Sequence, residues 1–151
     1  MTTNNQHVTR RLNLWYCGGQ AFYFGTFCSI IGYASVFLLH RGFTNSQIGI
    51  ILAIGNLLAV IVQPWLASWA DSHPEVPLAR NMTIMSAIMV AAILLVVFMP
   101  MNVLVLSALL VLSITILMIL MALMNSLAFV YEPQGYKVNY GIGRGLGSGF
   151  Y

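Results

Sequence analysis

Three long stretches without a charged residue constrain this chain more than any other feature of its sequence. Asp, Glu, Lys and Arg are absent from residues 12–39, 48–70 and 81–131. A helix needs about 20 apolar residues to cross a bilayer, so each of the first two stretches fits one crossing. The third is too long for one crossing and is interrupted by the sequence Met-Pro-Met-Asn at residues 99–102. We therefore expect two helices joined by a tight turn there.

The fold class that follows is an all-α integral membrane protein with four transmembrane helices and the start of a fifth. The expected spans lie at about residues 12–39, 47–70, 81–99 and 103–130, and from 140 onward, the last being incomplete. Only 6% of the residues are charged, against about 25% in ordinary globular domains, which excludes a water-soluble fold. The net charge of +3 is small and the basic residues are scattered along the sequence, which excludes a basic nucleic-acid-binding face. The lipid bilayer is the expected partner.

The basic residues predict which side of the membrane each loop faces. With a cytoplasmic N-terminus, Arg10, Arg11, Arg80 and Lys137 fall inside the cell, and Arg41 falls outside. The positive-inside rule favours this orientation. We therefore predict a multi-pass protein of the cytoplasmic (inner) membrane with its N-terminus in the cytoplasm.

The first span has two distinct faces. Gly18, Gly25 and Gly32 recur every seven residues and predict a side that another helix approaches closely. The opposite side is polar and aromatic and carries Gln20 and Tyr23. This side fits a water-filled cavity in which Gln20 and Tyr23 bind a solute. It fits equally well a hydrogen bond from Gln20 to a neighbouring helix.

The second span begins with a capping signal and continues with a polar stripe. Thr44, followed three residues later by Gln47, predicts a capping box. Asn56 and Gln63 lie seven residues apart, and we interpret them as interhelical hydrogen-bond partners in a helix-packing seam. Pro64 is expected to kink this helix.

The segment 140–151 is rich in glycine, but its spacing matches neither the Walker pattern nor the dinucleotide fingerprint. Read as a helix, it has one stripe of small residues for close helix contact: Gly141, Gly145 and Gly149. Tyr140, Arg144 and Tyr151 share another face. An arginine that enters the membrane on an aromatic face is a candidate binding residue. The alternative is a cytoplasmic arginine that snorkels to the membrane surface.

The sequence offers no constellation for catalysis or for a cofactor. The four spans contain no nucleophile paired with a base, no carboxylate pair and no set of metal ligands. The nine methionines are interpreted as flexible packing residues. We therefore expect neither an enzyme nor a metal or cofactor site.

Two motifs point to a known family. Gln63-Pro64 is followed by Asp71 seven residues beyond the proline, and Tyr140-Gly141-x-x-Arg144-x-x-Gly147 continues to an aromatic residue at 151. The first motif resembles the second helix and following loop of the major facilitator superfamily, in particular the oligosaccharide:proton symporter branch that includes lactose permease. The second is similar to the start of the fifth helix in that branch.

The resemblance implies a twelve-helix transporter with a central sugar cavity. In that picture Arg144 hydrogen-bonds sugar hydroxyls, Tyr151 stacks on the sugar ring, and Asp71 belongs to the cytoplasmic gating loop. The branch places a carboxylate near the end of the fourth helix, where this chain has Asn125 and Ser126. Either residue can accept a hydrogen bond from Arg144, but neither can neutralise its charge.

The resulting hypothesis is a secondary active transporter that moves a sugar or similar small polar solute by alternating access, with the proton as coupling ion. The chain is then expected to be an N-terminal fragment, about a third of the transporter, without the remaining C-terminal helices. The alternative is a small self-contained four-helix membrane protein, either a homo-oligomeric exporter or an accessory subunit, without sugar transport.

Overall fold

The computed structural model describes all residues except 1–2, 74, 99–101, 135, 137 and 150–151. All regular secondary structure in the described part of the chain is helical. Four described helical segments are long and apolar enough to cross a membrane: His7–His40, Asn45–Ala70, Leu78–Phe98 and Val103–Leu127. The expected fold class, an all-α membrane protein with four such helices and a further helix after them, is confirmed.

The chain divides into two compact units, which are described separately. The first contains the described residues of Met1–Gly32 and Leu123–Tyr151, and the second contains Tyr33–Ala122. Two helices therefore contribute residues to both units: the first span and α5 (Val103–Leu127).

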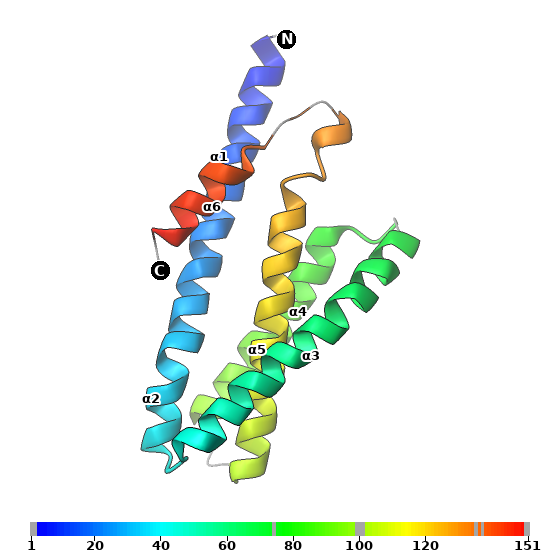
Figure 1. The fold of residues 1–151 in the computed structure, drawn as a ribbon. Coiled ribbons are helices and arrows are strands. Elements are labelled where there is room, and N and C mark those ends of the chain that lie inside the picture. Colours follow the sequence, from blue (N-terminus) through cyan, green and yellow to red (C-terminus); the bar gives the residue numbers. More distant parts are fainter. Residues whose placement is uncertain (1–2, 74, 99–101, 135, 137, 150–151) are drawn as a thin grey trace. The chain divides into compact units, whose positions relative to one another are not determined.

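In the first unit, α1 (Thr3–Phe27) continues into a π-helical segment, η1 (Cys28–Gly32), and α6 (Tyr140–Ser148) packs on α1 (Figure 1). Between α5 and α6 the chain forms a short 3₁₀ helix, η2 (Glu132–Gln134). The fourth span ends at Leu127, where we had expected helix to about residue 130.

Two buried glycines, Gly143 and Gly147, allow α6 to pack closely against α1. A Cβ atom added at Gly143 would lie 2.5 Å from Cδ1 of Tyr16, and one added at Gly147 would lie 2.6 Å from Cδ2 of Phe24. Both distances are shorter than any ordinary carbon–carbon contact, so the packing requires glycine at these two positions. The contact with α1 is therefore made about half a turn away from the predicted stripe, and Gly145 of that stripe meets nothing within 4 Å among the described residues.

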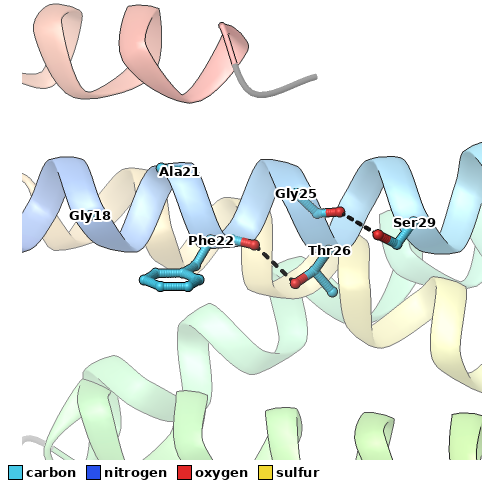
Figure 2. Close-up of a pocket in the computed structure, with 6 residues that line it drawn as sticks. All are labelled: Gly18, Ala21, Phe22, Gly25, Thr26 and Ser29. Carbon is cyan, nitrogen blue, oxygen red and sulfur yellow. Dashed lines mark hydrogen bonds between the residues drawn. The ribbon is translucent and has the colours of Figure 1, made fainter.

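The glycine side of α1 also differs from the prediction. Among the described residues, a Cβ atom added at Gly18 or Gly25 would meet nothing within 4 Å, so the expected close helix contact is not seen within this unit. This side instead forms a shallow hollow of about 630 Å³ (Figure 2). The hydroxyls of Thr26 and Ser29 in the hollow donate to backbone carbonyls one turn earlier, of Phe22 and Gly25.

The second unit contains α2 (Tyr33–His40), α3 (Asn45–Ser72), α4 (Leu78–Phe98) and the first part of α5. The capping box at the start of α3 is confirmed. The Gln47 N–H donates to Oγ1 of Thr44 at 3.3 Å, and the Thr44 N–H donates to Oε1 of Gln47 at 2.9 Å. The tight turn before it uses Gly42, whose φ of +84° is disfavoured for residues with a side chain.

α3 and α5 pack closely in this unit. A Cβ atom added at Gly55 would lie 2.8 Å from Cγ2 of Ile114. The Gln63 amide donates to the Met118 carbonyl at 3.1 Å, which confirms Gln63 as an interhelical hydrogen-bond partner. The same interpretation was wrong for Asn56, because its side chain is exposed and donates to Leu52 in its own helix. An asparagine side chain is short enough to fold back on the preceding turn.

Candidate binding site around Arg144

The start of α6 is fixed by two asparagines. Asn139 is the N-cap residue: its Oδ1 accepts a hydrogen bond from the Ile142 N–H at 3.1 Å. Its own N–H donates to Oδ1 of Asn13 in α1 at 2.7 Å. Sequence reasoning missed both residues, although an asparagine one position before a helix is a recognised N-cap signal. The two hydrogen bonds set where α6 begins and therefore where Arg144 points.

Arg144 lies in the first half of α6, half-buried between an amide and an aromatic ring. Its Nη1 donates to Oδ1 of Asn125 at 3.0 Å. Its Cζ lies 6.0 Å from the centre of the Tyr140 ring, within range of a cation–π contact. The Tyr140 ring in turn stacks on Phe129, with 5.9 Å between ring centres. Asn125 thus accepts a hydrogen bond from Arg144, as expected from the sequence.

The polar and aromatic side of α1 faces α6. Gln20 is only 1% exposed, and its amide donates to the Tyr16 hydroxyl at 2.8 Å. Tyr16 lies against Gly143, and Gln20 lies against Gly147. The described hydrogen bond of Gln20 is therefore within its own helix, rather than to the neighbouring helix that one interpretation of the sequence proposed. Its burial places a polar group directly beneath the helix that carries Arg144.

Two further predicted residues, Tyr23 and Ser126, lie in the same unit, and Tyr23 is within electrostatic range of Arg144. Tyr23 is buried, and its ring meets Phe24 edge to face at 5.7 Å between centres. Ser126 is exposed, and its hydroxyl donates to the Leu123 carbonyl in its own helix. Of the polar pair 125–126, Asn125 is thus the residue that reaches Arg144.

The structure does not describe the side chains of the remaining two predicted residues, Asp71 and Tyr151. Asp71 belongs to the last turn of α3, but its side chain is not described. Tyr151 lies outside the described residues. The gating role of Asp71 and the stacking role of Tyr151 stay predictions.

Four membrane-crossing helices, followed by a helix that carries a half-buried arginine, define a multi-pass membrane protein. A model of the MFS_1 like family, a major facilitator-like family, matches residues 14–150, and the chain belongs to this family. Membership indicates a transporter of a small solute in a lipid bilayer, rather than an enzyme. No curated protein and no solved structure matches the chain significantly.

Proposed function

We propose that the chain forms the N-terminal part of a secondary active transporter. It would move a sugar or similar small polar solute across the cytoplasmic membrane by alternating access, coupled to protons. The observation that carries this proposal is the placement of Arg144. A half-buried cation, held by the Asn125 amide over an aromatic ring, supplies directed N–H donors to a polar solute.

The other residues have proposed roles around Arg144. Asn125 orients the guanidinium. Gln20 and Tyr23, which are buried in this conformation, contact the solute when the cavity opens during alternating access. Ser126 and Tyr151 supply further solute contacts, the latter by stacking on a ring. These roles follow from the family resemblance together with the observed clustering of Gln20, Asn125 and Arg144 around α6.

Two proposals concern the rest of the transport cycle. Asp71, at the end of α3, gates the cytoplasmic side, because a carboxylate there can hold a helix N-terminus in one conformation and release it in the other. The remaining helices of the transporter supply the carboxylates that couple transport to protons. The N-terminus lies in the cytoplasm, as the basic loops predict.

Uptake of radiolabelled sugars tests the proposal in cells that express the complete reading frame. We expect accumulation that collapses when the proton gradient is dissipated. Arg144→Gln should lower the initial rate by about tenfold or more, because a charged donor to the solute is lost. The matched control is Arg80→Gln, which removes an exposed arginine in the first turn of α4. Normal membrane insertion without accumulation of any solute would overturn the proposal and favour the small accessory or exporter alternative.

A further inference from the structure

The charge of Arg144 is surrounded by uncharged groups. In the described residues, its partners are the Asn125 amide oxygen at 3.0 Å and the Tyr140 ring at 6.0 Å. Both attract a cation, but neither carries a negative charge that would neutralise it. An arginine side chain keeps its charge in proteins. Among the described residues, the site therefore presents one positive charge that its two neighbours do not neutralise.

In the part of the chain that the structure describes, no acidic side chain forms an ion pair with Arg144. The whole sequence contains three acidic residues, Asp71, Glu75 and Glu132, and none lies within the charge-free stretches that form the spans. Asp71 and Glu75 follow the second span, and Glu132 lies exposed in η2, between α5 and α6. The position that faces Arg144 from the end of α5 is instead an amide, Asn125.

Charged side chains within membrane proteins commonly pair with an opposite charge or with backbone carbonyls. The guanidinium carries five N–H donors in a fixed planar fork, a shape that matches a carboxylate bidentately. One donor is used on Asn125, which also fixes the plane of the group. Sugar hydroxyls can accept hydrogen bonds from the other donors, but they leave the positive charge uncompensated.

We infer that the transported solute carries an anionic group, and that Arg144 is its ion-pair partner. The solute is then a sugar acid or a similarly small polar carboxylate, and Asn125 holds the guanidinium without competing for its charge. This inference rests on the proposed transport function and specifies the class of solute for that same site.

The test compares sugar acids with the neutral sugars from which they are formed by oxidation. Uptake is measured for three radiolabelled pairs: glucose and glucuronate, galactose and galacturonate, and lactose and lactobionate. Cells express the complete reading frame as wild type or as variants with equal membrane insertion. We expect wild type to accumulate at least one acid about tenfold or more faster than its neutral partner, because a site built around a charged group rejects the analogue that lacks it.

The decisive variant is Asn125→Asp, which keeps the size of the side chain and its hydrogen-bond acceptor. The new carboxylate lies at the position of an oxygen now 3.0 Å from Nη1 of Arg144 and neutralises the guanidinium internally. Acid uptake should fall by about tenfold or more, while the ratio of neutral to acid uptake rises. A purely structural role of Asn125 would lower the uptake of both members of a pair alike.

The control for added charge is Asn102→Asp. Asn102 is exposed at the start of α5, and its Oδ1 accepts a hydrogen bond from the Val105 N–H at 2.9 Å. Aspartate serves equally well as a helix cap, so this variant adds one carboxylate without changing the local structure. Its preference for the acid should equal that of wild type.

Each other outcome is informative. Preferred uptake of the neutral members, lost in Arg144→Gln, would overturn the anionic solute and leave the proposed transport function standing. A preference for the acid that Asn125→Asp does not change would overturn the assignment to Arg144. No uptake of any of the six compounds by inserted protein would overturn both proposals.

Discussion

Replacing Gly143 by alanine tests the packing that holds α6, and with it Arg144, against α1. The added Cβ would lie 2.5 Å from Cδ1 of the Tyr16 ring. The ring is buried, and its hydroxyl accepts the Gln20 hydrogen bond at 2.8 Å. It therefore cannot swing aside without breaking a buried hydrogen bond, so we expect α6 to shift outward.

The magnitude follows from two opposing effects. Overpacking of a close contact costs about 1–3 kcal/mol. Alanine is also a better helix former than glycine by about 1 kcal/mol, which offsets part of that cost. Gly145→Ala is expected to show the helix-propensity effect alone, because a Cβ atom at Gly145 meets nothing within 4 Å among the described residues. The difference between the two variants thus isolates the overpacking cost, about 1–3 kcal/mol.

Thermal unfolding of the two purified variants in detergent, each made from the complete reading frame, measures this difference. The midpoint of Gly143→Ala should therefore lie below that of Gly145→Ala. Equal midpoints, or a higher one for Gly143→Ala, would refute the close contact between α6 and Tyr16.

Four further outcomes are expected. Thr44→Ala removes the capping box of α3 and should lower the free energy of unfolding by about 1 kcal/mol, seen as a lower thermal midpoint. Gln63→Leu leaves the Met118 carbonyl without its interhelical donor and should cost about 0.6 kcal/mol. Asn56→Leu should cost less in the same thermal assay, because Asn56 bonds only within its own helix among the described residues. Asn102→Cys, in a background without the two native cysteines, should react with a membrane-impermeant maleimide added to intact cells; labelling only after lysis would contradict the predicted cytoplasmic N-terminus.

The register of α6 shows where sequence reasoning reaches its limit. Glycine occupies every second position from 141 to 149, so the sequence contains two stripes with four-residue spacing. Spacing alone ranks neither stripe first. The choice is made by Tyr16 and Phe24, more than 100 residues earlier in the chain, which fit only against Gly143 and Gly147. That information lies in tertiary packing, which no local pattern carries.

Other features were local enough to predict. Thr44 and Gln47 are three residues apart, and the capping box depends on that spacing alone. The hydrogen bond between Arg144 and Asn125 was predicted from the family resemblance. The resemblance indicates that the end of the fourth span lies next to the start of the fifth, which residue spacing alone cannot show. The bond between Asn13 and Asn139 joins residues 126 positions apart and had no such guide.

The π-helical segment Cys28–Gly32 has a consequence for comparing this chain with its homologues. A π turn closes its hydrogen bonds over one residue more than an α turn. A homologue whose first span is a regular α-helix would therefore need a one-residue gap in this segment when the two sequences are aligned. Without that gap, every residue of α2, from Tyr33 to His40, would be matched to a position rotated by about 100° around the helix.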